Sequence, residues 1–283
     1  MLWENLREEE FKEAIEKSGG VCIVPVGCLE KHGQHLPVGT DVIHSQEVAR
    51  LAAEEEYAVV FPSMYFGEKS GSGEYAGTVM FSAPLRFEIL KETCKEIARN
   101  GFKKILFYNG HGGNHNMLLN YSRSVLFDKE DFMVFKADLG VVIVPQILEE
   151  HKEGKYDYLT DEDVKTLQAL VDNNVELGHG CFVETGIVYG SRPETVRIDK
   201  MDQESGLSTH RFDEFGKRGI QTHFSWMGNY PNSYTGGYHP GLTETIAKAM
   251  VEHSKDNLKK QIKFLKEETI SDEFLAEWLA KQD

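Results

Sequence analysis

Four side chains that could bind a metal ion or carry a proton follow one apolar segment near the start of the chain. The segment leads at once into a stretch that presents Glu30, His32, His35 and Asp41. Glu30 and His32 are two residues apart, so in extended backbone their side chains point to the same face. A carboxylate and an imidazole that converge suit Mn²⁺, Zn²⁺ or Fe²⁺ better than Ca²⁺, which prefers oxygen ligands. The glycine- and proline-containing run 33–39 predicts a turn that returns Asp41 to the same place.

A second segment repeats the pattern, which favours a site over a solvated loop with no function. The apolar run 104–108 leads directly into NGHGGN, residues 109–114, so that His111 also follows a predicted strand. Gly112 and Gly113 leave room for a ligand or metal to approach the backbone. The alternative is a glycine-rich phosphate loop that opens the next helix. However, no lysine follows to make a P-loop, and the spacing is not GxGxxG.

Short apolar runs that alternate with helical periodicity predict the framework for these residues. The predicted strands are Val21–Val26, Ala58–Phe61, Lys104–Tyr108 and Phe132–Lys136, and the predicted helices between them are Val42–Glu56 and Leu85–Asn100. This alternation, with β-branched residues in the strands, is typical of an α/β fold with a largely parallel sheet. Side chains at the carboxyl ends of parallel strands line the crevice where α/β proteins bind ligands.

The second half of the chain is less regular. Residues 151–160 are charged and predict a surface connection, and a helix is expected at Asp161–Val171. Residues 186–217 have weak periodicity and predict loops and short elements, whereas Pro240–Glu268 predicts a long helix. Because no repeat, low-complexity tract or linker composition is evident, we expect residues 1–283 to form one domain with insertions.

Composition and charge narrow the class of protein. The 283 residues are 40% hydrophobic and 27% charged, which is ordinary for a globular chain. A net charge of −15 without a local basic stripe argues against a nucleic-acid partner. No apolar run approaches the roughly 20 residues of a membrane helix. The acidic, amphipathic N-terminus resembles neither a secretory signal nor a transit peptide, so a cytoplasmic location is expected.

The four cysteines do not predict a disulfide framework or a zinc finger, because none forms a CxxC pair. They are Cys22, Cys28, Cys94 and Cys181. Our interpretation is that they are small buried hydrophobic residues, the usual state of free cysteine.

Several of these motifs together resemble the creatininase family. Gly27–Asp41 is similar to its first signature, a Gly followed by Glu-x-His-Gly, His-Leu-Pro and Gly-Thr-Asp, and NGHGGN at 109–114 is similar to its second. HGCFVET at 179–185 is a weaker match to a third segment, and GSGEYAGT at 71–78 resembles the family's substrate loop. The matches are spread from about residue 20 to about residue 250, so they cover most of the chain.

The resemblance implies a three-layer α/β/α fold that assembles as a homohexamer and holds two divalent ions, Zn, Mn or Fe, in each chain. In the family's pattern Glu30 and His111 hold one ion, His32 holds the other, and Asp41 bridges both. Creatininase supplies a further carboxylate two residues after the second-signature histidine, but this sequence has Gly113 there. We therefore expect Glu184 to be the fourth ligand of the second ion. Three carboxylates and one hydroxide would balance the four positive charges.

Hydrolysis is the reaction that such a pair of ions favours. A metal lowers the pKa of bound water, and the resulting hydroxide attacks a carbonyl that the ions polarise. The candidate catalytic residues are His179, for proton transfer or oxyanion stabilisation, and Glu184; the alternative for His179 is a structural role. By resemblance, the candidate substrate-binding residues are Ser72, Glu74, Tyr75, Gly112 and His115.

Family resemblance does not fix the small-molecule substrate. Creatininase-like proteins open cyclic amides or cleave formamides, and others hydrolyse a C–C bond in a cyclic diketone of inositol catabolism, the 3-dehydro-scyllo-inosose hydrolase type. Creatininase covers its substrate with two tryptophans in the segment before the position of His179, but residues 148–178 contain none. They contain Tyr156 and Tyr158, and residues 229–239 are also rich in hydroxyl and amide groups. Such a pocket would suit a polyhydroxylated ligand.

The expected function is therefore hydrolysis of a cyclic amide or formamide C–N bond, with C–C hydrolysis of a cyclic diketone as the alternative. Two further alternatives are a lyase or isomerase that acts through an enolate, and a metal-binding protein that has lost activity. The intact set of Glu30, His32, Asp41 and His111 disfavours the inactive protein.

Overall fold

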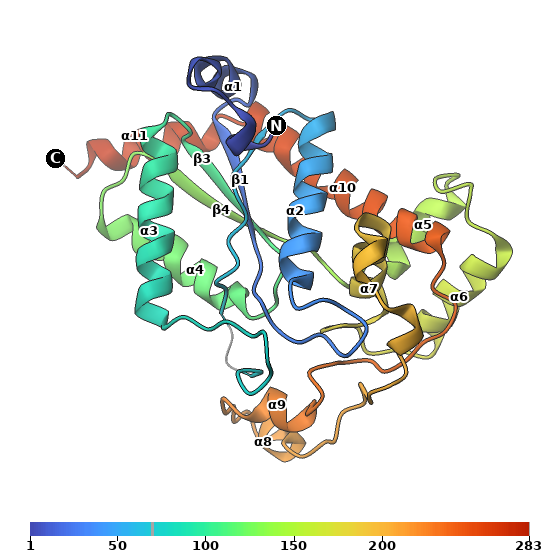
Figure 1. Cartoon of the computed structure of the whole chain (residues 1–283). Helices are drawn as coiled ribbons and strands as arrows, with labels where there is room; N and C mark the ends of the chain where they lie inside the picture. The colour runs from blue at the N-terminus through green and yellow to red at the C-terminus, as the bar shows by residue number, and fades with distance from the viewer. Residues whose placement is uncertain (69–70, 283) are drawn as a thin grey trace.

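The architecture is built on a parallel sheet (Figure 1). A computed structural model describes residues 1–68 and 71–282 of the chain. Within these residues, one four-stranded sheet has the order β2-β1-β3-β4, formed by β1 (Val21–Val26), β2 (Val59–Val60), β3 (Lys104–Asn109) and β4 (Met133–Asp138). All neighbouring pairs are parallel. Val26 pairs with Asn109, which pairs with Asp138, so three strands end at the same level.

Helices cover both faces of the sheet because successive side chains of each strand point to opposite sides. Val21 and Ile23 belong to the core under one helical layer, and Cys22 and Val24 to the core under the other. The first layer contains α2 (Thr40–Glu55), α5 (Val144–Lys152), α6 (Asp161–Asp172), α7 (Phe182–Ser191) and α10 (Glu244–Glu267), and the second contains α3 (Ala83–Arg99) and α4 (Asn114–Ser124). The predicted α/β/α fold with a parallel sheet is confirmed.

The remaining elements are short or lie outside these layers. The other α-helices are α1 (Phe11–Lys17), α8 (Asp213–Lys217), α9 (Ser225–Asn229) and α11 (Ile270–Ala280), and the 3₁₀ helices are Trp3–Asn5, Glu8–Glu10, Val125–Phe127, Pro193–Thr195 and Ile198–Lys200. Figure 1 shows α8 and α9 beyond the carboxyl ends of the strands, opposite α1. In the described part of the chain, no helix is long and apolar enough to span a membrane.

The predicted elements agree with the structure in place and differ at their ends. The first strand has the predicted bounds, but the second is reduced to two residues. The long helix begins at Glu244 and not at Pro240, because the Thr243 hydroxyl accepts a hydrogen bond from the Ile246 amide and caps it there. The surface connection predicted from residue 151 begins after Lys152, where α5 ends.

The second half differs from expectation at one helix. Residues 186–191, in the stretch expected to form loops and short elements, are the last six residues of α7. Every side chain from Phe182 to Val188 is buried, because the helix packs between α2 and α10. A helix that is buried on all sides has no polar face, so it lacks the periodicity by which sequence reasoning detects helices.

A close backbone contact at Gly27 joins the sheet to α2. A Cβ atom there would lie 2.5 Å from the Val42 amide nitrogen and 2.6 Å from the Asp41 carbonyl carbon. We expect Gly27→Ala to lower the free energy of unfolding by about 1–3 kcal/mol, as overpacking does. Urea denaturation measures the change. Gly216→Ala is the matched control, since nothing lies within 4 Å of its Cβ position; equal stability of the two variants would contradict the contact.

Candidate metal centre

The loop between β1 and α2 brings the first three predicted ligands together. The Glu30 amide donates to the Val38 carbonyl at 2.9 Å, which closes the loop on itself, and Gly33 has a φ of +62° that permits the turn. Helix α2 then starts at Thr40, so Asp41 lies in its first turn. Glu30, His32 and Asp41 are all buried.

Asp41 lies between two imidazoles. Its Oδ1 is 3.0 Å from Nε2 of His32, and its Oδ2 is 3.0 Å from Nδ1 of His111. His111 comes from the turn after β3, which ends level with β1. Each oxygen of the carboxylate therefore faces a different nitrogen ligand, the arrangement that a carboxylate shared by two ions requires.

Two groups of possible ligands meet at Asp41. In the first, Oε1 of Glu30 is 3.0 Å from Nδ1 of His111, and Cys28 joins Glu30, Asp41 and His111 within 4.8 Å of one another. In the second, Nε2 of His32 is 3.7 Å from Oε2 of Glu184, and these two group with Asp41 within the same limit. The structure thus places the five predicted metal ligands in one buried cluster.

Backbone carbonyls fix which nitrogen of each histidine faces the cluster. Nδ1 of His32 is 3.0 Å from the Glu30 carbonyl oxygen, and Nε2 of His111 is 2.8 Å from the Glu68 carbonyl oxygen. A carbonyl only accepts, so those nitrogens carry the proton. Each histidine can therefore release the proton on the nitrogen that faces the carboxylates and still donate from the other nitrogen, as metal-ligating histidines do.

The cluster needs positive charge. Burial alone would raise the pKa of Asp41, but His32 and His111 hold it well below its usual value. Burial would likewise lower the pKa of His32, but Asp41 and Glu184 raise it to about 9. Burial raises the pKa of Glu184 to about 7, although His32 opposes the shift. In the protein alone, protons on the imidazoles partly offset three buried carboxylates; divalent cations fit the same donors and supply that charge fully.

His179 lies against both groups. Its ring stacks on His32 with a centroid distance of 3.9 Å, and its Nδ1 is 3.6 Å from Oε1 of Glu30. Its Nε2 is 2.6 Å from the Lys31 carbonyl oxygen and donates to it. Trp226 meets the other side of the imidazole edge-on at 5.1 Å.

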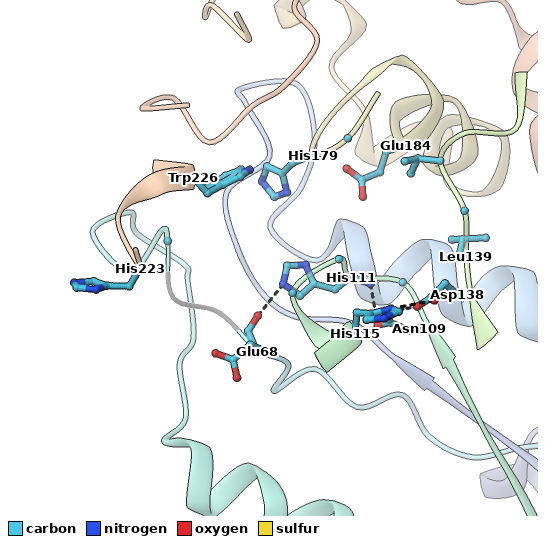
Figure 2. Close-up of a pocket in the computed structure, with 17 residues that line it drawn as sticks. Glu68, Asn109, His111, His115, Asp138, Leu139, His179, Glu184, His223 and Trp226 are labelled. Atoms are coloured by element: carbon cyan, nitrogen blue, oxygen red, sulfur yellow. Dashed lines mark hydrogen bonds and ion pairs between the residues drawn. The ribbon is translucent and has the colours of Figure 1, made fainter. Parts of the chain in front are cut away.

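A cavity of about 680 Å³ opens beside the cluster (Figure 2). His111, His179 and Glu184 are among its lining residues, so the ligand cluster is accessible from it. The others are Glu68, Gly71, Asn109, Gly110, Gly112, Gly113, His115, Asp138, Leu139, Gly140, Val141, Gly178, His223 and Trp226. Figure 2 shows Trp226 and His179 on one side of the space, with Asn109, His115 and Asp138 on another.

The structure places two of the five predicted substrate-binding residues at the cavity. Gly112 and His115 line the cavity. Ser72 is buried and its hydroxyl donates to Oε2 of Glu30 at 3.0 Å, so it holds the carboxylate of that predicted metal ligand in place. Glu74 is exposed and the Tyr75 hydroxyl donates to the Pro231 carbonyl, and neither residue lines the cavity.

The residues from which a hydroxyl-rich pocket was inferred lie away from the cavity. Tyr156 donates to Glu150 at 2.7 Å and Tyr158 to Glu252 at 2.6 Å, and neither they nor any residue of 229–239 lines the cavity. Both tyrosines pack with the core between α5, α6 and α10. The aromatic residue at the cavity is Trp226 of α9, which was missed because tryptophan was sought only in residues 148–178.

Cys28 was also missed as a chemical residue. It is fully buried as expected, yet its Sγ lies 3.0 Å from Oδ2 of Asp41 and 3.3 Å from Oε1 of Glu30. Burial, followed by the Asp41 charge, raises the pKa of the thiol well above its usual value. A signal was available, because Cys28 precedes Glu30 by two residues, the spacing that places side chains on one face of extended backbone.

Two further histidines hold the surrounding loops. Nε2 of His35 contacts Oγ1 of Thr185 at 2.9 Å, which ties the β1–α2 loop to α7. Nε2 of His44 donates to the Gly110 carbonyl at 2.7 Å, which ties α2 to the turn that carries His111. These contacts hold the segments that carry the clustered side chains at a fixed spacing.

In sequence comparison, residues 4–262 match the creatininase family, which is described as creatinine amidohydrolase. The chain is 24% identical over 215 residues to the creatinine amidohydrolase of Pseudomonas putida, a match that covers 73% of this chain and 78% of that protein. It is 35% identical over 98 residues to the mycofactocin precursor peptide peptidase of Mycolicibacterium smegmatis, which covers 32% of this chain and 39% of that protein.

Solved structures show the same fold. Creatinine amidohydrolase (creatininase) superposes with a TM-score of 0.70 at 19% identity, over 95% of this chain and 98% of that one. A manganese creatininase gives 0.70 at 18% identity, over 94% and 99% of the two chains. A Zn–Zn type of a creatininase variant gives 0.66 at 19% identity, over 92% and 98%.

Proposed function

This chain belongs to the creatininase family of metal-dependent hydrolases, and we propose that it uses two divalent ions to hydrolyse the C–N bond of a small cyclic amide or formamide. The observation that carries the proposal is Asp41, whose two oxygens face His32 and His111 from separate ligand groups. We assign Glu30 and His111 to the first ion and His32 and Glu184 to the second, with Asp41 bridging. Bound there, the ions would supply an activated water and polarise the substrate carbonyl.

His179 is suited to move the proton that the leaving nitrogen needs. Its Nε2 is held on the Lys31 carbonyl, so Nδ1 is the nitrogen that faces the ligand cluster. Stacking on His32 and the edge-on contact with Trp226 restrict rotation of the His179 ring. A positioned imidazole of this kind contributes typically 10²–10⁴-fold as a general acid or base. The Glu184 carboxylate is held in a fixed position, because the Gly180 amide donates to its Oε2 at 2.5 Å.

The cavity supports a substrate with a flat amide. Trp226 presents an aromatic wall beside His179. His115 and Asp138 form a polar wall opposite, with Nδ1 of His115 3.4 Å from Oδ2 of Asp138. Because the tyrosines lie elsewhere, the reason for preferring a polyhydroxylated ligand is gone. The two curated relatives are named as enzymes that cleave C–N bonds, so we favour that reaction over C–C hydrolysis of inositol catabolism and over enolate chemistry.

The open cavity also argues against an inactive metal-binding protein, which would have no need of the roughly 680 Å³ that reaches three of the clustered residues. We include in the proposal a homohexameric assembly, a cytoplasmic location and a choice of metal among Zn, Mn and Fe. Solved creatininase structures include a manganese form and a Zn–Zn form.

Metal removal and reloading test the function. The protein reloaded with Zn²⁺, Mn²⁺ or Fe²⁺ should bind close to two ions per chain by elemental analysis and hydrolyse at least one member of a panel of cyclic amides, formamides, short peptides and inosose-type ketones. In H₂¹⁸O, the label should appear in the carboxylate released from an amide. The metal-free protein should show a loss of about 10³-fold or more. Cleavage of the ketone alone, or activity that persists without metal, would overturn the proposal.

A further inference from the structure

Cys28 occupies a position in the first ligand group that no family motif assigns. Resting on the proposed two-ion centre, we infer that Cys28 is a direct ligand of the first metal ion and binds it as a thiolate. The first ion is then held by one sulfur, one nitrogen and two carboxylate oxygens, from Cys28, His111, Glu30 and Asp41. Such a set favours Zn²⁺ or Fe²⁺ over Mn²⁺, because thiolate is a soft ligand.

The distances are those of a ligand shell. The Cys28 Sγ lies 3.0 Å from Oδ2 of Asp41 and 3.3 Å from Oε1 of Glu30, and Nδ1 of His111 lies 3.0 Å from each of these oxygens. A tetrahedral ion with bonds of about 2.0–2.3 Å separates its donors by roughly 3.3–3.7 Å. In these four pairs the atoms need to move apart by only a few tenths of an ångström to surround an ion, and all four atoms lie within 4.8 Å of one another.

The fourth donor of the first group comes from the β1–α2 loop, which carries Cys28, and not from position 113. Gly113 has no side chain, and a Cβ there would lie 2.5 Å from Nε2 of His111 and 2.6 Å from the Glu68 carbonyl oxygen. Nε2 of His111 and the Glu68 carbonyl oxygen contact each other, which fixes the His111 tautomer. This contact leaves no room for a carboxylate side chain at position 113. Glu184 does not replace it, because its oxygens group with His32 and Asp41. Cys28 is the remaining member of the first group.

Burial makes the assignment chemically consistent. Cys28 is fully buried, and its sulfur contacts two carboxylate oxygens and the His111 imidazole. Without an ion, the S–H bond donates to these oxygens and the thiol stays neutral. On binding, the S–H bond breaks, a sulfur–metal bond forms, and the proton leaves to solvent; no electron is transferred. With Glu30, Asp41 and Glu184, the thiolate brings the negative charges to four, which equals the charge of two divalent ions.

Cobalt substitution provides the test, because a thiolate on Co²⁺ gives a near-ultraviolet charge-transfer band that oxygen and nitrogen ligands do not give. We expect the band in the wild-type protein loaded with Co²⁺ and in Cys94→Ala, a control whose sulfur lies in α3 outside both groups. Cys28→Ser and Cys28→Ala should lose the band and weaken one of two binding steps by about tenfold or more, with an unchanged urea midpoint. X-ray absorption of the zinc form should show one Zn–S distance of about 2.3 Å.

The outcomes separate this inference from the proposed function. Two bound Co²⁺ ions without the band, or a band that persists in Cys28→Ser, would overturn the assignment of Cys28 and leave the amidohydrolase proposal standing. A sulfur band in a protein that hydrolyses no amide would support Cys28 and overturn the function. Failure to bind Co²⁺ or Zn²⁺ at all would overturn both.

Discussion

Asp41→Ala is expected to remove both metal ions at once and to lower kcat/KM by about 10³-fold or more. The reason is geometric: Oδ1 of Asp41 faces His32 in one group and Oδ2 faces His111 in the other, each at 3.0 Å. Glu30 also groups with each histidine, but in the described chain only Asp41 lies within 3.0 Å of both, one oxygen to each. A loss of this size corresponds to about 4 kcal/mol of transition-state stabilisation, within the several kcal/mol that metal catalysis supplies. Elemental analysis and steady-state kinetics measure the two effects.

Two variants make the result specific. His32→Ala should lose mainly the second ion, because His32 belongs with Glu184 and not with His111. Asp138→Ala removes a carboxylate from the wall of the same cavity but from neither of these groups, so it should retain both ions. Equal, partial metal loss in Asp41→Ala and His32→Ala would show that Asp41 binds a single ion.

The strands were predictable, though not their order in the sheet. Val21–Val26 and Lys104–Asn109 are short, apolar and buried on both faces, contain β-branched and aromatic residues and are followed by glycine turns, so their type follows from local pattern. Helix α7 was not predictable in this way. Its apolar residues contact α2 on one side and α10 on another, and a sequence does not reveal by periodicity that two sides will be covered.

The site was predictable where its residues lie close together in the sequence. Glu30 and His32 lie in one loop and Asp41 in the first turn of the helix that follows, and the parallel sheet brings the end of β3 with His111 beside them. Trp226 reaches the cavity from a connection 47 residues beyond His179, and only tertiary packing determines that contact. Cys28 was overlooked for a different reason. Burial is the usual state of a free cysteine, and it concealed a sulfur that contacts two carboxylates.

Position 113 illustrates how a departure from the family's pattern can be interpreted in two ways. The sequence indicated that a carboxylate was absent and suggested Glu184 as its replacement. The structure puts Glu184 beside His32, on the other side of Asp41 from His111. Glu184 is therefore a candidate ligand of the second ion in its own right, and the gap left by Gly113 concerns the first.

Glu184→Gln is expected to weaken the second ion selectively and to lower kcat by about 10²–10³-fold, while the fold is retained. The amide oxygen of glutamine can still accept from the Gly180 amide, so the first turn of α7 keeps its contact. Burial raises the pKa of Glu184 to about 7, so in the metal-free protein its proton must leave before a cation binds. The affinity for the second ion should therefore rise with pH through the neutral range in wild type. The rise should be less steep in the Gln variant, where His32, with a pKa of about 9, still has to lose a proton but residue 184 does not.

Calorimetric titrations of Zn²⁺ at several pH values, with urea denaturation as the check on folding, separate Glu184 from a structural residue. Glu176→Gln is the matched control. Glu176 is exposed in the connection that precedes α7, and it accepts a hydrogen bond from the Tyr230 hydroxyl, away from the ligand groups. If His179 moves a proton, as proposed, His179→Ala should retain both ions and still lose most of the rate. Loss of an ion would instead make His179 a ligand together with Glu30 and His32, with which it groups within 4.8 Å. If Glu184→Gln binds two ions with unchanged affinity and pH dependence, its carboxylate only orients His32 and the start of α7, and the second ion is completed by water or substrate.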